Sequence, residues 1–186
     1  MEFDQVKREL GRYLVSAAGK RELATLTPSA DHDQIQYWLD ETTDGADILR
    51  LTGGIPIPKL KNIQPQLKRL RINANLNGTE LAQITKVLQT SMSVKNFFAE
   101  FKEQQKVELR VINESVQQLI TIPTITKRLI QSIDPDGRVT DEASTKLHGI
   151  RQLISKTEAE IHQRMERFTQ GKNAKYLSDA IVTVRN

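Results

Sequence analysis

Apolar residues recur every three or four positions along most of the chain, which is the pattern of amphipathic helices. The first such run extends from Phe3 to Leu26, where Gly19 is expected to bend or break the helix. Pro28 is expected to end it, because the residue before a proline is disfavoured in the helical conformation. Asp31, with Gln34 three residues later, resembles a capping box and predicts a second helix. The apolar face expected for that second helix comprises Ile35, Trp38, Leu39, Ala46 and Leu49.

Two glycines and two prolines within Thr52–Pro58 predict the end of this second helix. The segment from Lys59 to Arg71 follows and contains five cations and no acidic residue. Pro65 suits the first turn of a short helix within it. The cations of this basic segment are Lys59, Lys61, Lys68, Arg69 and Arg71.

Three more helices are expected before residue 133. A long one should run from about Thr79 to Glu103, with Asn77 or Thr79 as its cap. A second is expected near residues 107–120, and a short third one after Pro123. The sequence Asp-Pro-Asp-Gly at 134–137 then predicts a tight turn, followed by at most one arm of a hairpin.

The longest regular helix is expected from about Ser144 to Gln170, where apolar residues between Leu147 and Ile161 follow a heptad rhythm. Packing of this seam against the chain's own helices is the favoured interpretation, and an extended lever is the alternative. The β-branched tail at 180–186 predicts a strand, and a lone strand without a partner suggests that the chain was cut from a longer protein.

These patterns predict an all-α fold, an elongated multi-helix bundle with one long lever-like helix and a short C-terminal β-strand stub. The expected organisation is a helical core region at 1–132, a turn or short hairpin connection at 133–143, a long lever helix at 144–171 and the start of a truncated β-element at 172–186.

The composition narrows the class of protein. The chain has 186 residues, no cysteine and only 5% aromatic residues, which excludes a disulfide scaffold and argues against a β-sandwich. Its net charge of +4 is too small to establish a nucleic-acid partner by itself. The N-terminus lacks the features of a signal peptide and no apolar run could span a membrane, so a cytoplasmic location without a membrane partner is expected.

The sequence offers no recognisable catalytic or metal-binding motif. Gly19 and Lys20 are followed by Arg21, where a phosphate-binding loop needs Ser or Thr. The turn at 134–137 lacks the remaining ligands of a calcium loop. The three histidines, His32, His148 and His162, are too far apart to form a typical zinc site. No catalytic residue, metal, cofactor or small-molecule substrate is therefore expected for this chain alone.

The basic segment is the best candidate for a functional surface, because Lys and Arg side chains bind phosphates without reading the base sequence. An ordinary solvated surface is the alternative, since no aromatic residues interleave for base stacking. A second group of cations lies around the end of the long helix, where the helix dipole also favours positive charge. Its members are Arg164, Arg167, Lys172 and Lys175.

Four stretches occur in a specific order: MEFDQVKRELGRYLVSAAGK, LRLTGGIPIPKLKNIQPQLKRL, IDPDGRVTDEASTKLHGIRQLI and AKYLSDAIVTVRN. Together they resemble the N-terminal region of the second-type bacterial MutS family over essentially the whole chain. Members of that family lack the mismatch-reading domains and carry a nuclease domain at the C-terminus. The residues that match the family's structural signatures are Gly53, Gly54, Pro56, Asp136, Gly137, Lys175 and Tyr176.

The resemblance implies a non-catalytic core and lever region of an ATP-dependent endonuclease that acts as a homodimer and uses ATP and Mg. Branched DNA and collided ribosomes are the implied partners, and the choice between DNA and ribosomal RNA stays open. The ATPase and nuclease residues of the family have no counterpart in this chain. A scaffold or dimerisation module without direct nucleic-acid contact is the alternative function.

Overall fold

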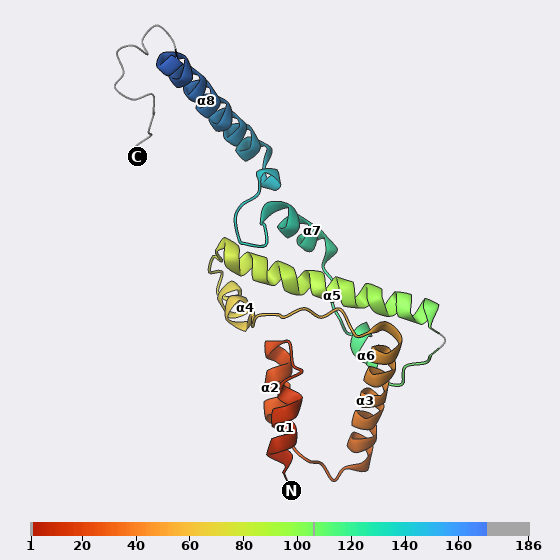
Figure 1. The fold of residues 1–186 in the computed structure, drawn as a ribbon. Helices are drawn as coiled ribbons and strands as arrows, with labels where there is room; N and C mark the ends of the chain where they lie inside the picture. Colours follow the sequence, from red (N-terminus) through yellow and green to blue (C-terminus); the bar gives the residue numbers. More distant parts are fainter. Residues whose placement is uncertain (1, 106, 171–186) are drawn as a thin grey trace. The chain divides into compact units, whose positions relative to one another are not determined.

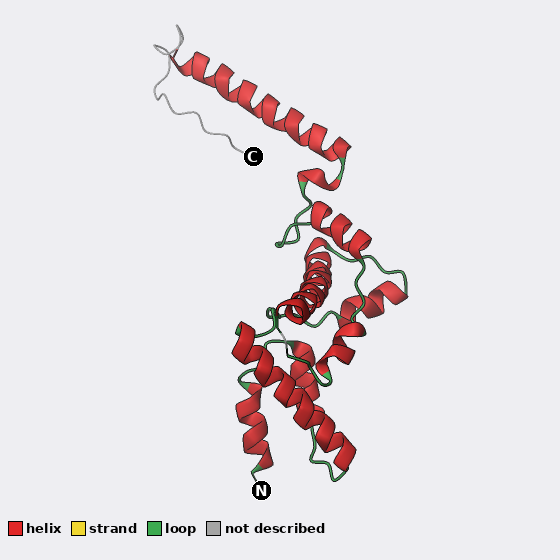
Figure 2. Ribbon diagram, turned by 90° about the vertical axis from the view of Figure 1, so that its right-hand side faces the viewer, coloured by secondary structure: helices red, strands yellow, loops and turns green. Residues whose placement is uncertain are grey.

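The computed structural model describes residues 2–105 and 107–170. Within them the chain forms eight α-helices and one short 3-10 helix, and it contains no β-sheet (Figures 1 and 2). The all-α prediction is confirmed. The predicted strand and the rest of the β-element at 172–186 lie outside the described residues.

The chain divides into two compact units, Met1–Arg138 and Val139–Asn186. Their boundary falls within the connection predicted at 133–143. The finer four-part organisation stays a prediction.

The first helical run is interrupted at residues 12–16, so the expected break at Gly19 is wrong. Helix α1 spans Phe3–Gly11 and helix α2 spans Ala17–Thr25. Gly19 lies in the first turn of α2, where its N–H donates to Ser16 Oγ over 3.0 Å. The Ser16 side chain thus starts a new helix at a position that apolar periodicity does not mark.

Helix α3 spans His32–Thr52 and begins where the sequence predicts. The Asp31 carboxylate accepts hydrogen bonds from the backbone N–H groups of Asp33 and Gln34, so its capping role is confirmed. The helix ends at Gly53, whose φ of +78° is the left-handed conformation that glycine favours.

The predicted apolar face of α3 is wrong. Leu39 and Leu49 are 56% and 62% exposed, whereas Asp44 and Ile48 are buried. The buried face of α3 is rotated toward Asp44 because that carboxylate binds the backbone at the start of α6.

Helix α4 spans Gln64–Arg71, with Pro65 in its first turn as predicted. Helix α5 spans Gly78–Gln104 and is the longest helix described. Asn77 caps it in a full capping box with Glu80, so the prediction of Asn77 as one possible cap is confirmed.

Helix α6 spans only Ile112–Gln117, shorter than the helix predicted at 107–120. Its N-terminal approach is not helical because the backbone N–H groups of residues 110–112 bind Asp44. Helix α7 spans Pro123–Ser132 and packs on α5.

The core of the first unit is small and gathers around α5. Phe97 and Phe98 meet edge to face, with ring centroids 5.3 Å apart. Burial of these apolar side chains is the main term that stabilises the unit. The buried cluster comprises Ile48, Val94, Phe98, Phe101 and Leu109.

The second unit contains the 3-10 helix Asp141–Ala143 and helix α8, Thr145–Gln170. Ser144 caps α8 by accepting the Leu147 N–H over 3.1 Å. Within the second unit, no described residue covers the heptad seam: Ile154 and Ile161 are 51% and 53% exposed. Packing of this seam against the chain's other helices stays a prediction, as does the alternative of an extended lever.

Candidate nucleic-acid interface

The structure divides the basic segment into two groups. Lys59 and Lys61 lie in the irregular stretch between α3 and α4, whereas Lys68, Arg69 and Arg71 lie in the last two turns of α4. All five residues are exposed. The position of the second group also suits the negative end of the helix dipole.

Arg69 differs from the other four because its charge is already paired. Its guanidinium donates to the Glu80 carboxylate and to the backbone carbonyl of Asn75. Glu80 in turn accepts the backbone N–H of Asn77 over 2.9 Å in the capping box. Arg69 therefore ties the end of α4 to the start of α5.

The remaining cations of the segment are not neutralised. Among the described residues, no carboxylate lies within ion-pair distance of these four side chains. They are therefore free to attract an anionic partner. The four are Lys59, Lys61, Lys68 and Arg71.

A cavity of about 520 Å³ lies beside the first of these groups. An isolated parallel bridge between Ser16 and Leu60 holds the stretch beside the start of α2. This contact brings Arg21 of α2 and Lys61 to the lining of one cavity. Sequence reasoning missed Arg21 as a member of this surface, because only the bridge between distant segments places it there.

The second predicted group of cations lies in the other unit. Arg164 and Arg167 are exposed on α8. Lys172 and Lys175, together with the signature residue Tyr176, lie outside the described residues.

The signature glycines take conformations that explain their presence. Gly53 and Gly54 have φ values of +78° and +128° and lead the chain out of α3 toward Pro56. Gly137 has a φ of +88°, and a Cβ there would lie 2.5 Å from the backbone nitrogen of Thr79. These residues shape the backbone and contribute no reactive group.

The Asp134–Gly137 turn is confirmed and is closed by its own polar groups. The Asp134 side chain accepts the backbone N–H groups of Asp136 and Arg138 over 3.0 and 2.7 Å. The turn packs against the start of α5, where a Cβ on Gly78 would overlap the Gly137 carbonyl oxygen. Asp136 therefore takes part in this turn through its backbone N–H, which donates to the Asp134 side chain.

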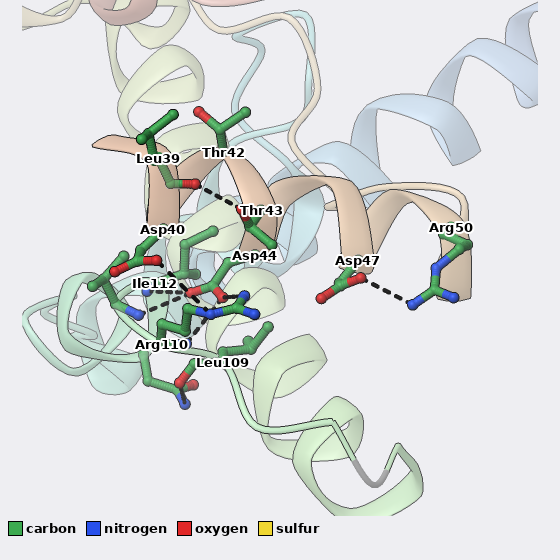
Figure 3. A network of polar contacts seen from close by, with 12 residues as sticks. Leu39, Asp40, Thr42, Thr43, Asp44, Asp47, Arg50, Leu109, Arg110 and Ile112 are labelled. Carbon is green, nitrogen blue, oxygen red and sulfur yellow. Dashed lines mark hydrogen bonds and ion pairs between the residues drawn. The ribbon is translucent and has the colours of Figure 1, made fainter. Parts of the chain in front are cut away.

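A buried carboxylate, Asp44 of α3, lies at the centre of a network of polar contacts with the segment before α6 (Figure 3). Both oxygens of Asp44 are used: one accepts the Arg110 N–H over 2.9 Å, and the other accepts the N–H groups of Val111 and Ile112 over 2.9 and 3.1 Å. Arg110 also approaches Asp44 with its guanidinium, and Asp40 lies 3.8 Å from Arg110 Nε. Asp44 of α3 therefore anchors α6, which lines the cavity.

The environment of Asp44 acts on its pKa in two directions. Burial raises the pKa of the carboxyl, but the three backbone hydrogen bonds and the charge of Arg110 outweigh burial and leave the pKa below its ordinary value. The group thus stays ionised and is fully occupied by hydrogen bonds. It serves the fold and is not poised for proton transfer.

The described part of the chain contains no cluster of acidic or histidine side chains that could hold a metal ion. His32, His148 and His162 are all exposed. None of the described helices is long and apolar enough to cross a membrane.

Curated relatives match the chain over its whole length, although no family model matches it. It is 53% identical to the protein named endonuclease MutS2 of Levilactobacillus brevis over 186 residues, which is 24% of that protein. It is 48% identical to endonuclease MutS2 of Lactiplantibacillus plantarum and of Enterococcus faecalis, over 24% and 23% of their lengths. The chain therefore spans about a quarter of the length of these relatives.

Proposed function

Since the chain is an N-terminal region of the MutS2 family, we propose that it is the non-catalytic helical core and lever of an ATP-dependent endonuclease. In this role it contacts nucleic acid through Lys59, Lys61, Lys68 and Arg71. Cleavage, ATP and Mg belong to the other three quarters of the parent protein, which acts as a homodimer. Branched DNA and ribosomal RNA are the candidate partners.

The unpaired state of these four cations is the observation that carries the proposal. Arg69 lies among them in the sequence but is neutralised by Glu80, whereas the other four form no ion pair with any described residue. Exposed cations release the counterions of a phosphate backbone when they bind it, and this release favours binding. No base-stacking aromatic is needed for such sequence-independent contact.

Helix α8 supplies the lever. Its 26 residues extend over about 39 Å at 1.5 Å per residue. A helix of this length can carry a movement from one end to the other as a rigid element, provided that a partner stiffens its seam. Arg164 and Arg167 near its C-terminal end are further candidates for phosphate contact.

Charge reversal in the complete parent protein tests the interface. The variant with Glu at positions 59, 61, 68 and 71 should bind a four-way DNA junction, or collided ribosomes, more weakly. The slope of log Kd against log salt concentration should fall by about 3 to 4 for four lost phosphate contacts. Fluorescence anisotropy over a salt series measures both quantities.

A matched control changes the net charge equally at other exposed cations, namely Lys86, Lys102, Lys146 and Lys156. Its affinity and salt slope should stay close to those of the unmodified protein. Equal losses of affinity in the two variants would mean that net charge alone causes the effect. An unchanged salt slope in the first variant would refute the proposal that these four residues contact nucleic acid.

The apolar seam of α8, which is exposed within its own unit, favours a second candidate function, a scaffold or dimerisation module. Apolar seams of this kind pair with another helix in coiled coils. Light scattering of the 186-residue chain, combined with a DNA mobility shift at moderate salt, separates the two functions. A dimer that shifts no DNA would favour the scaffold.

A further inference from the structure

Helices α5 and α7 lie side by side in the first unit and form a groove of about 360 Å³ between them (Figure 1). Ser91 Oγ donates to the Ile120 carbonyl over 3.0 Å, so the chain enters α7 beside the middle of α5. Gly137, in the turn after α7, packs against Gly78 at the start of α5. Helix α7 is thus fixed at both ends along the first half of α5, and the two walls of this α5–α7 groove are held in place.

Uncharged polar side chains of α5 form one wall of the groove. Gln89, Ser93 and Asn96 all line it, and their spacing of four and three residues places them on one face of the helix. All three are exposed. Among the described residues, the side-chain hydrogen bonds of α5 and α7 involve other groups. These three side chains can therefore offer their donors and acceptors to a ligand.

The groove lies in a part of the unit without negative charge. The sequence has no acidic residue at 81–99, within α5, or at 115–133, which includes α7. Lys127 is the charged residue among those that line the groove, and its neighbour Arg128 is exposed as well. Neither cation forms an ion pair with a described carboxylate. The groove therefore suits a ligand that carries an anion and several neutral polar groups.

The chemistry of the α5 wall indicates which neutral groups these are. An amide side chain has both a donor and an acceptor, and so does a hydroxyl. Phosphate oxygens only accept hydrogen bonds, whereas the ribose 2′-hydroxyl both donates and accepts. DNA lacks this hydroxyl. No aromatic residue lines the groove to stack on a base, so the backbone of the nucleic acid is the matching part.

We propose that the α5–α7 groove binds the ribose–phosphate backbone of an RNA duplex. Gln89, Ser93 and Asn96 contact 2′-hydroxyls, which duplex RNA displays along its shallow minor groove. Lys127 contacts an adjacent phosphate. This site deepens the proposed function and rests on it for contact with nucleic acid. It adds a surface that selects RNA to the basic segment, whose cations bind phosphates of either nucleic acid.

Alanine substitution in the complete parent protein tests the site. The triple variant Gln89→Ala, Ser93→Ala and Asn96→Ala places a strong helix former at three exposed positions, so α5 should stay folded. It should bind an RNA duplex about tenfold more weakly, and a DNA duplex of the same base sequence at most about twofold more weakly. The salt slope should not change, because neutral side chains release no counterions.

Fluorescence anisotropy measures these affinities. Equal losses for RNA and DNA would refute selection of RNA, and an unchanged RNA affinity would refute the site and leave the groove to a protein partner. A matched control, Gln104→Ala with Gln117→Ala, changes exposed amides that do not line the groove. It should leave both affinities unchanged, and a loss equal to that of the triple variant would also overturn the proposal.

A change in the ligand tests the same contacts without relying on the variant. A 2′-O-methyl RNA duplex lacks the hydroxyl donor and should bind the unmodified parent protein about tenfold more weakly than RNA does. The triple variant should then bind it with the same affinity as the unmodified protein. If the two losses instead add, the α5 side chains do not contact the hydroxyls and the proposal fails.

The charge-reversal variant of the basic segment separates this site from the proposed function. If that variant loses affinity and salt slope while the triple variant keeps its full RNA affinity, the groove is refuted and the proposed function stands. If the triple variant loses RNA selectively while the charge-reversal variant keeps its slope, the groove is supported and the basic segment is refuted.

Discussion

Several buried polar side chains of the first unit have their hydrogen-bond partners inside the protein. Asp44 is fully buried and accepts the backbone N–H groups of Arg110, Val111 and Ile112. The buried hydroxyls of Thr85, Thr90 and Thr126 donate to carbonyls of their own helices over 2.8 Å. Each of these groups is satisfied inside the protein, which is the condition for burying it without a large penalty.

Asp44→Asn should lower the free energy of unfolding by about 2–4 kcal/mol. The amide presents one acceptor oxygen in place of two, so at least one buried backbone N–H loses its partner. Asp47→Asn is the matched control, because Asp47 lies on the same helix and pairs with the exposed Arg50. It should cost at most about 1 kcal/mol. Equal losses in urea unfolding would contradict the role of Asp44.

The pH dependence of stability follows from the lowered pKa of Asp44. The carboxyl binds a proton less readily in the folded chain than in the unfolded chain, so its contribution is present above about pH 4 and is lost as the pH falls below that value. Unfolding free energies between pH 6 and 2 should therefore converge for the unmodified chain and Asp44→Asn. A constant difference down to pH 2 would refute the expectation.

The role of Asp44 could not be predicted from the sequence. It lies in the polar run Thr42-Thr43-Asp44-Gly45, which suggests a solvated face, and its partners follow more than sixty residues later. Arg69 shows the same limit on the candidate interface. The sequence identifies it as one of five cations, and only the folded chain brings Glu80 to it.

Element ends were predicted where a single residue or turn determines them. Asp31 and Asn77 cap their helices, Gly53 ends α3, and Pro65 starts α4, because each signal acts on its own neighbours. The buried face of α3 was missed because it depends on packing between distant segments. All-α architecture was thus predictable, whereas the orientation of a helix about its own axis was not.

Gly53 and Gly137 both have a positive φ, but only at Gly137 would an added Cβ also clash with another part of the backbone. Substitutions at the two positions therefore distinguish the free-energy cost of the backbone conformation from that of the steric clash. Gly53→Ala should cost about 1–2 kcal/mol, since its φ is positive but nothing lies within 4 Å of the added Cβ. Gly137→Ala should cost at least about 1–3 kcal/mol more, because its Cβ would also meet the Thr79 backbone. Chemical denaturation measures both losses. Similar losses of stability in the two variants would mean that the turn at Gly137 is not in close contact with the start of α5.

The two units of the molecule differ in how their helices are stabilised. Helix α5 buries Thr90, Val94, Phe98 and Phe101 in the first unit. Within its own unit, by contrast, α8 leaves residues 148–167 exposed. A helix without buried side chains relies mainly on its own hydrogen bonds, and these open more readily.

Hydrogen exchange should reveal this difference directly. Backbone amides of residues 94–101 in α5 should exchange at least about a hundredfold more slowly than those of residues 150–161 in α8, because core amides exchange only with opening of the whole unit. Mass spectrometry of the 186-residue chain measures both segments in one experiment. Equal protection would contradict the expectation and indicate that α8 has a partner in solution.

The Asp44 network also bears on how quickly the first unit forms and how long it lasts. Its hydrogen bonds join residues 66 to 68 positions apart, whereas each helix forms from bonds four positions apart. Closing so long a loop is entropically costly until other contacts have shortened it. We expect the network to form late, after α3 and α5 have met. Its loss should then act mainly on the unfolding rate, which makes Asp44 a determinant of the lifetime of the folded unit more than of its speed of formation.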